Sequence, residues 1–261
     1  MERTQAIALL TDGGIEVEGR LRGASNTTLR ATITLDGVSA RCVYKPVRGE
    51  RPLWDFPTGT LAGREVAAYL VSEATGWDVV PPTVLRIGPL GEGACQLWID
   101  TCDDDVVDFV PAGALPDHWI SVAAAQDDNG NPYLLAHSDT VGLARMALFD
   151  AVINNADRKG GHVLPTADGH LYGIDHGVSF HVEDKLRTVL WGFLGRPIAP
   201  AEREALSALG RDLLGGFGQR LTDHISSDEV LAAAVRVERL LASGVYPGPS
   251  DDWPAVPWPP F

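Results

Sequence analysis

Cysteine is scarce in this sequence, and the few cysteines are far apart. Cys42, Cys95 and Cys102 are the three present, and no CxxC motif occurs. The pattern therefore predicts neither a disulfide framework nor a zinc site. A reducing, cytoplasmic compartment is the expected location.

Long hydrophobic runs are also missing from the sequence. No stretch reaches the roughly 18 consecutive apolar residues of a membrane-spanning helix. The opening segment "MERTQAIALL" lacks the basic region and the longer apolar run of a signal peptide. We expect a protein that is neither secreted nor embedded in a membrane.

Basic residues are outnumbered by acidic ones. The 21 Lys and Arg against 35 Asp and Glu give a formal net charge of −14. Such a charge disfavours attraction to nucleic acid and to anionic bilayers, so we expect neither as a partner. Hydrophobic residues make up 45% of the 261 positions. This content is sufficient for one large domain or for two lobes, each with its own apolar core.

The first hundred residues are patterned mainly as antiparallel strands. "LRATITL" at 29–35 and "SARCVYK" at 39–45 flank an Asp-Gly hairpin signal. Residues 58–76 predict one helix, because apolar side chains recur there at helical spacing and a glycine ends the run. "VVPPTVLRI" and "ACQLWI" predict two further buried strands.

The second part of the chain is patterned mainly as helices. Composition turns acidic and loop-like at "DTCDDDVVDF", and we place the lobe boundary near residues 99–105. Residues 138–156 predict a long helix, and 200–243 predict one or two more. Between them, "HVLPTADGHLYGID" predicts a short hairpin. The Pro- and Trp-rich tail from residue 246 predicts extended chain.

These elements predict an α+β, bilobal, protein-kinase-like fold. Residues 1–99 would form an N-lobe with an antiparallel, nucleotide-binding sheet and one helix. Residues 100–261 would form a mainly helical C-lobe, and the two lobes together would make one catalytic domain.

Two charged residues of the first lobe have the types that a phosphoryl transferase needs for binding ATP. Lys45, in "VYKP", would neutralise the α and β phosphates. Glu65, in "REVAAYLV", would hold that lysine in place as an ion pair, with Glu73 as a rival for this role. The alternative for both residues is an ordinary solvated charge.

The run "NNADRKGGHVL" and the following "YGIDHGVSF" supply the remaining groups of such an enzyme. Asp157 would orient or deprotonate the acceptor hydroxyl, and Lys159 would steady the transferring phosphoryl group. Asp175, in "IDHG", would bind the metal that bridges the phosphates, Mg²⁺ or Mn²⁺. The Asp-x-Lys order of the first run is that of protein-kinase catalytic loops.

The chain resembles the phosphatidylinositol 3- and 4-kinase superfamily. It is most similar to type II phosphatidylinositol 4-kinases and to related bacterial proteins, including the actinobacterial kinase-like family. The resemblance runs in order from Gly23 to about Phe180, through "VYKP", "WDVVPPTVLR", "CQLWID", "FDAVINNADR" and "YGIDHGVSF".

The resemblance implies further ATP-binding residues. Trp98 and Ile99 would border the adenine, with backbone hydrogen bonds from this hinge. A turn over the phosphates would be formed by Ser25, Asn26, Thr27 and Thr28, although it is poorer in glycine than most such turns.

The sequence departs from the kinase pattern five residues after the catalytic aspartate. There the pattern has an asparagine for a second metal, and this chain has His162. An imidazole suits Mn²⁺ and other transition metals better than Mg²⁺. We therefore take His162 and Asp175 as the candidate metal ligands. The alternatives are that His162 faces the pocket without touching metal, or that Asn155 is the ligand.

The sequence therefore predicts an ATP-dependent phosphotransferase that moves the γ-phosphoryl group to a hydroxyl of a protein or a soluble small molecule. The alternative is a nucleotide-binding pseudokinase with a regulatory or scaffolding role, which His162 and the glycine-poor turn favour. An inositol lipid kinase is disfavoured, because no strongly basic run could bind an inositol phosphate. The acceptor itself has no readable sequence code.

Overall fold

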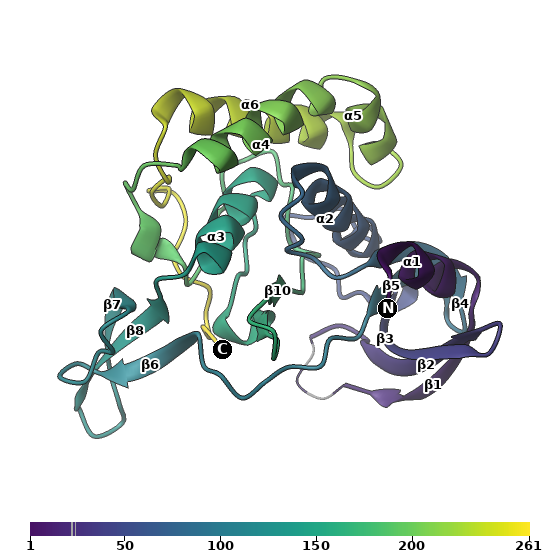
Figure 1. The fold of residues 1–261 in the computed structure, drawn as a ribbon, viewed down its shortest axis with the longest axis horizontal. Coiled ribbons are helices and arrows are strands. Elements are labelled where there is room, and N and C mark those ends of the chain that lie inside the picture. The colour runs from purple at the N-terminus through teal and green to yellow at the C-terminus, as the bar shows by residue number, and fades with distance from the viewer. Residues whose placement is uncertain (22, 24) are drawn as a thin grey trace.

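An antiparallel sheet forms the first lobe in the computed structural model, which describes residues 1–21, 23 and 25–261 (Figure 1). Within these residues the sheet has five strands in the order β1-β2-β3-β5-β4. They are β1 (Gly14–Arg20), β2 (Leu29–Leu35), β3 (Val38–Pro46), β4 (Thr83–Gly88) and β5 (Gly91–Leu97). The predicted hairpin is confirmed, with Asp36 and Gly37 both at positive φ in its turn.

One helix packs on each face of this sheet. Helix α1 (Arg3–Asp12) covers one face, where Leu9 and Leu10 pack with Ile33, Cys42 and Cys95. Helix α2 (Leu61–Thr75) covers the other face, where its side chains pack against the sheet residue Ala94. The sequence pattern predicts α2 but not α1. The apolar residues of α1 are consecutive in "AIALL" rather than spaced at helical intervals, so they carry no periodic signal.

The N-terminus of helix α2 is capped by a carboxylate that is distant in sequence. Glu50 follows the 3₁₀ turn η1 (Val47–Gly49) and accepts hydrogen bonds from the backbone N–H groups of Leu61 (3.2 Å) and Ala62 (2.8 Å). A negative charge at this end also complements the helix dipole. Glu50 therefore fixes the start of the helix that carries Glu65.

A second sheet, not expected from the sequence, lies beyond the linker formed by residues 98–106. It consists of β6 (Val107–Pro111), β7 (Trp119–Gln126) and β8 (Pro132–Ser138), in the order β6-β8-β7. It lies at the opposite end of the molecule from the first sheet (Figure 1). The acidic stretch "DTCDDDVVDF" at 100–109 was interpreted as loop, and that interpretation was wrong for residues 107–109, which belong to β6.

The rest of the molecule is mainly helical, which completes the predicted α+β, bilobal, kinase-like architecture. Its elements are α3 (Val141–Ile153), η2 (Gly160–His162), β9 (Val163–Pro165), β10 (Leu171–Gly173), η3 (Trp191–Phe193), α4 (Pro200–Leu213), α5 (Gly216–Leu221) and α6 (Ser227–Ser243). The predicted hairpin is the β9–β10 pair. Helices α4, α5 and α6 lie over α3 and α2 (Figure 1).

The Pro-rich tail returns across this second lobe. The carbonyl of Ala255 accepts from the N–H of Thr188, and the carbonyl of Pro260 accepts from the N–H of Gly160 at 2.8 Å. The ring of Phe261 lies so close to Gly160 that a Cβ there would be 2.2 Å from it. Gly160 therefore allows the tail to pack directly on the loop that follows α3.

In the part of the chain that the structure describes, no helix is both long enough and apolar enough to cross a bilayer.

We predict that α1 is an integral part of the sheet's core. Leu10 is fully buried, so Leu10→Ala should lower the free energy of unfolding by about 2 to 5 kcal/mol. The matched control is Leu231→Ala on α6, where the side chain is 56% exposed; it should change stability by about 0.5 kcal/mol or less. Urea unfolding of both variants makes the comparison. Equal effects would show that α1 packs only loosely.

Candidate functional site

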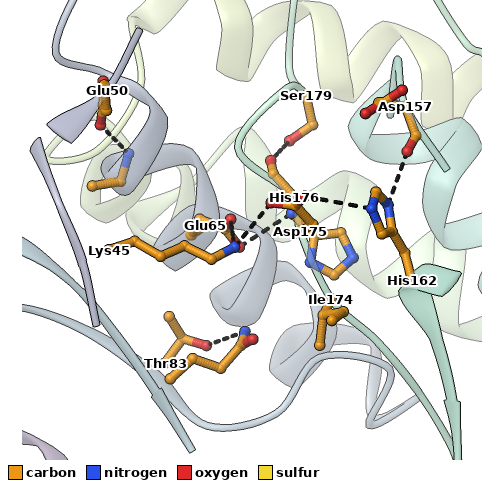
Figure 2. A network of polar contacts seen from close by, with 12 residues as sticks. Lys45, Glu50, Glu65, Thr83, Asp157, His162, Ile174, Asp175, His176 and Ser179 are labelled. Carbon is orange, nitrogen blue, oxygen red and sulfur yellow. Dashed lines mark hydrogen bonds and ion pairs between the residues drawn. The ribbon is translucent and has the colours of Figure 1, made fainter. Parts of the chain in front are cut away.

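Three charged side chains from separate elements meet between the two lobes (Figure 2). The ammonium of Lys45, on β3, forms an ion pair with Glu65, on α2, and a second one with Asp175 at 3.0 Å. Asp175 follows β10, 130 positions further along the chain than Lys45. The side chain of Glu65 is 3% exposed and that of Asp175 is 54% exposed. The cluster is thus closed on the α2 side and open on the Asp175 side.

The charges in this cluster support one another. Burial alone would lower the pKa of Lys45, but the carboxylates of Asp175 and Glu65 outweigh it and raise that pKa above its usual value. The ammonium of Lys45 in turn holds the pKa of Asp175 well below its usual range. At neutral pH the lysine is therefore cationic and Asp175 is anionic.

The backbone at Asp175 adopts a conformation that few residues other than glycine favour. Its φ is 62°, in the left-handed region. The next residue holds this turn, because the N–H of His176 donates to Glu65 Oε2 at 3.1 Å. Strained backbone of this kind is common where a side chain is held for function.

The imidazole of His162 points its free nitrogen at Asp175. Its Nδ1 lies 3.0 Å from the carbonyl oxygen of Asp157. A carbonyl can only accept, so Nδ1 carries the hydrogen. Burial lowers the pKa of His162 to about 4, which keeps the ring neutral at neutral pH. Its Nε2 therefore presents a lone pair to Asp175 Oδ2, 3.4 Å away.

Two hydrogen-bond acceptors that face each other fit a cation placed beside both. A ring nitrogen whose partner nitrogen donates to a carbonyl is also the usual arrangement of a histidine that ligates metal. Among the residues that the structure describes, no three His, Cys, Asp or Glu side chains form a metal-binding group. A metal here would complete its coordination with phosphate and water oxygens.

Asn155, the alternative ligand, is held within the loop, and ligation by the second lone pair of its amide oxygen stays a prediction. Its amide nitrogen donates to Asp150 Oδ1 at 2.9 Å, and its amide oxygen accepts from the N–H of Asp157 at 3.0 Å. Both ends of the amide are engaged in shaping the loop.

Asp157 and Lys159 lie at the start of this loop as an ion pair. Lys159 Nζ is 3.4 Å from Asp157 Oδ2, and both side chains are partly exposed. Burial raises the pKa of Asp157 even though Lys159 opposes this effect. A carboxylate with a raised pKa is a better proton acceptor than an exposed one.

A buried ion pair that the sequence analysis missed holds the loop in place. Arg158 donates from Nε and Nη2 to the two carboxylate oxygens of Asp150, at 2.8 and 2.9 Å, and both side chains are fully buried. Nη1 of Arg158 also donates to the carbonyls of His162 (3.2 Å) and Ile174 (3.0 Å). One guanidinium thus connects α3, the loop and the strand that leads to Asp175.

The same guanidinium fixes the ring of His176. Arg158 Nη2 donates to His176 Nε2 at 2.7 Å, and burial lowers the pKa of His176 well below its usual value. The ring is therefore neutral, and its Nδ1 is buried without a partner among the described residues. The adjacency of Arg158 to Asp157 was the only sequence signal for this network.

We predict that this network is the main polar contribution to the stability of the loop. Asp150→Asn leaves Arg158 charged and buried without a counter-ion, so it should lower the free energy of unfolding by about 3 to 5 kcal/mol. Asp139→Asn removes a carboxylate from an ion pair with Arg196 that is about four-tenths exposed on each side; it should lower stability by less than about 1 kcal/mol. Urea unfolding followed by tryptophan fluorescence measures both. Similar losses in the two variants would contradict the prediction.

The predicted turn over the phosphates lies beside the segment that leads to α2. Asn26 Oδ1 accepts from the N–H of Arg51 at 2.8 Å, and the N–H of Thr27 donates to Gly49 at 3.0 Å. Ser25 is exposed. No described contact joins Ser25, Asn26 or Thr27 to Lys45 or Asp175, and their role in ATP binding stays a prediction.

The predicted hinge is partly engaged by the protein itself. The N–H of Trp98 donates to the carbonyl of Arg41 at 3.0 Å, and the Arg41 guanidinium lies 5.5 Å from the centre of the indole ring. That N–H is therefore not a free donor for a base. The contribution of Ile99, which is half-buried, stays a prediction.

A sizeable cavity lies away from this cluster. It has a volume of about 960 Å³ and lies between α6, the segment 182–184 and the tail near Trp253. Its polar lining includes Asp184, which pairs with Arg239 at 2.9 Å. None of the residues in the Lys45 cluster lines it, so it is not the candidate site.

Comparison with solved structures identifies the class of fold. The structure of a Golgi casein kinase matches with a TM-score of 0.54 at 13% identity, covering 92% of this chain and 75% of that one. A Helicobacter pylori proinflammatory kinase, CtkA, gives a TM-score of 0.48 at 11% identity, covering 91% and 94%, which is too low to bear on the fold. The first match shows that the chain has a kinase-like fold.

Comparison with known sequences identifies the family. The chain is 48% identical over 264 aligned positions to Protein Rv2133c of Mycobacterium tuberculosis, covering 97% of this chain and 95% of that protein. It belongs to the same family as Rv2133c. No family model matches the chain, so membership of the phosphatidylinositol 3- and 4-kinase superfamily stays a prediction.

Proposed function

We propose that the protein is an ATP-dependent phosphotransferase that moves the γ-phosphoryl group to a hydroxyl of a protein or a soluble small molecule. The observation that carries the proposal is the chain of contacts from Glu65 to Lys45 to Asp175. It joins the sheet, α2 and the segment after β10 within a kinase-like fold. A lysine held by a glutamate, beside an aspartate that can bind metal, is what binding of ATP phosphates requires.

Each member of the cluster has a role in this proposal. Lys45 binds the α and β phosphates, and Glu65 orients it. Asp175 and the Nε2 of His162 hold a divalent metal, Mg²⁺ or Mn²⁺. When bound, the metal supplies positive charge that neutralises and orients the phosphate oxygens.

Asp157 is the proposed proton acceptor. The acceptor's hydroxyl oxygen forms a bond to the γ-phosphorus while the bond from that phosphorus to the β,γ-bridging oxygen breaks, and ADP leaves. The hydroxyl proton passes to the carboxylate of Asp157, whose raised pKa suits this step. Lys159, 3.4 Å from that carboxylate, steadies the transferring group.

A second candidate function is nucleotide binding without transfer, in a regulatory role. The histidine at position 162, where the kinase pattern has an asparagine for a second metal, favours it. The two candidates differ in one outcome, which is whether ADP and a phosphorylated product form.

We predict that Asp157→Asn keeps ATP binding but slows transfer by roughly 10² to 10⁴, the usual contribution of a positioned acid or base. The full chain is incubated with ATP and Mn²⁺ or Mg²⁺, ADP release is measured, and phosphorylation is detected by intact-mass spectrometry. Asp168→Asn, at the exposed turn of the β9–β10 hairpin, is the matched control and should keep the parent rate. ATP binding without ADP formation in the parent protein would favour the second candidate. Unchanged turnover in Asp157→Asn would remove this residue from the mechanism.

We also predict that His162 sets the metal preference. With an imidazole ligand the site should favour Mn²⁺ over Mg²⁺, and His162→Asn should shift the preference toward Mg²⁺. Because the pKa of His162 is lowered to about 4, the ring keeps its lone pair at pH 6 as well as at pH 8. The preference of the parent protein should therefore be the same at both values. Metal titrations of ATP binding test this, and an unchanged preference in the variant would show that His162 is not a ligand.

A further inference from the structure

Gln96 shares the inner face of the first sheet with Lys45. In the register of β3 and β5, Val43 is opposite Gln96 and Lys45 is opposite Ala94. Directly opposed residues, and residues two apart on one strand, project from the same face of a sheet. The other face carries Cys42 and Cys95, which are buried under α1. Gln96 therefore projects from the face of the sheet that carries Lys45 and on which α2 packs.

Gln96 lies on the linker side of Lys45. It precedes Trp98 by two residues at the end of β5, where the chain leaves the sheet for the second lobe. If Lys45 binds the phosphates, as proposed above, the base of the nucleotide extends toward this linker. On the inner face, Arg41 lies closer still to the linker, but its guanidinium is engaged with Asp100 and the ring of Trp98, which leaves Gln96 as the uncharged polar side chain between Lys45 and the linker.

A chain of hydrogen bonds fixes which end of the Gln96 amide is the nitrogen. The hydroxyl of Thr83 donates to the carbonyl of Pro81 at 2.7 Å, so its oxygen is available as an acceptor. The amide nitrogen of Gln96 donates to that oxygen at 2.9 Å. Reversing the amide would take the hydroxyl proton away from the Pro81 carbonyl. Because Thr83 and Pro81 are both buried, that loss is costly.

The amide oxygen of Gln96 is the atom left for a ligand. It receives no hydrogen bond from any described residue. It is also not fully buried, so a ligand can reach it. The whole side chain is only 5% exposed. This acceptor is therefore almost buried, still reachable from outside and fixed in direction, which suits a group that recognises one hydrogen-bond donor.

We propose that Gln96 recognises the base of the nucleotide by accepting a hydrogen bond from the 6-amino group of adenine. Amide side chains pair with adenine in this way because the amino group donates while the amide oxygen accepts. Hypoxanthine and guanine carry a carbonyl oxygen at position 6, which would face the Gln96 oxygen as a second acceptor. The site therefore selects adenine nucleotides, and this inference rests on the proposed function.

The test compares ATP with inosine triphosphate, whose base has an oxygen in place of the amino group at position 6 and a hydrogen on N1. The full chain is titrated with each nucleotide and Mn²⁺ by calorimetry. We expect ATP to bind about tenfold to a hundredfold more tightly, the usual effect of opposing two buried acceptors. Equal affinities would overturn this inference alone. No binding of either nucleotide would overturn the proposed function together with it.

Two variants separate recognition from packing. Gln96→Leu removes the acceptor, so ATP should bind more weakly and the ratio of the two affinities should fall toward one. Thr83→Val keeps Gln96 but frees its amide to turn, so inosine triphosphate should bind more tightly while ATP binding changes little. Thr75→Val, which makes the same chemical change at the far end of α2, should keep the parent ratio. Thermal unfolding confirms that each variant is folded, and a parent-like ratio in Gln96→Leu would overturn the proposal.

Discussion

The ammonium of Lys45 must balance two carboxylates that reach it from different parts of the chain. Its ion pairs with Glu65 and Asp175 are the polar contact that joins the sheet, α2 and the segment after β10. Glu65 is almost fully buried and has no other cation among the described residues. Removing Lys45 would therefore leave a buried charge uncompensated, which a protein interior tolerates poorly. The relative position of the two lobes and the geometry of the site depend on the same three charges.

The two carboxylate oxygens of Asp175 have different neighbours. One oxygen contacts Lys45 and the other faces the Nε2 of His162. A metal beside the second oxygen would leave the contact with Lys45 in place. The left-handed backbone at Asp175 and the hydrogen bond from His176 to Glu65 hold this orientation. Arg158, paired with Asp150, holds the same segment by donating a hydrogen bond to the carbonyl of Ile174.

Features that depend on local pattern were predictable from the sequence. The β2–β3 hairpin, helix α2 and the β9–β10 hairpin each carry a turn signal or an apolar period within a short stretch. The order of the charged motifs suggested that Lys45, Glu65 and Asp175 would lie together, and the structure brings them into contact.

Features that depend on distant contacts were not predictable. Arg158 looks like an ordinary loop residue until α3 places Asp150 against it, and Gln96 looks like an ordinary strand residue until β4 supplies Thr83. The engagement of the Trp98 N–H by Arg41 likewise follows from strand pairing that the sequence does not specify. Helix α1 and the second sheet lack a clear period because their burial is partial or irregular.

The most direct measurement is a crystal structure with a non-hydrolysable ATP analogue and Mn²⁺, in which anomalous diffraction locates the metal. The account predicts an anomalous peak in contact with Asp175 and the Nε2 of His162, the phosphates against Lys45, and the base beside Gln96. Manganese bound away from these two side chains, or an analogue bound outside the space between the lobes, would contradict it.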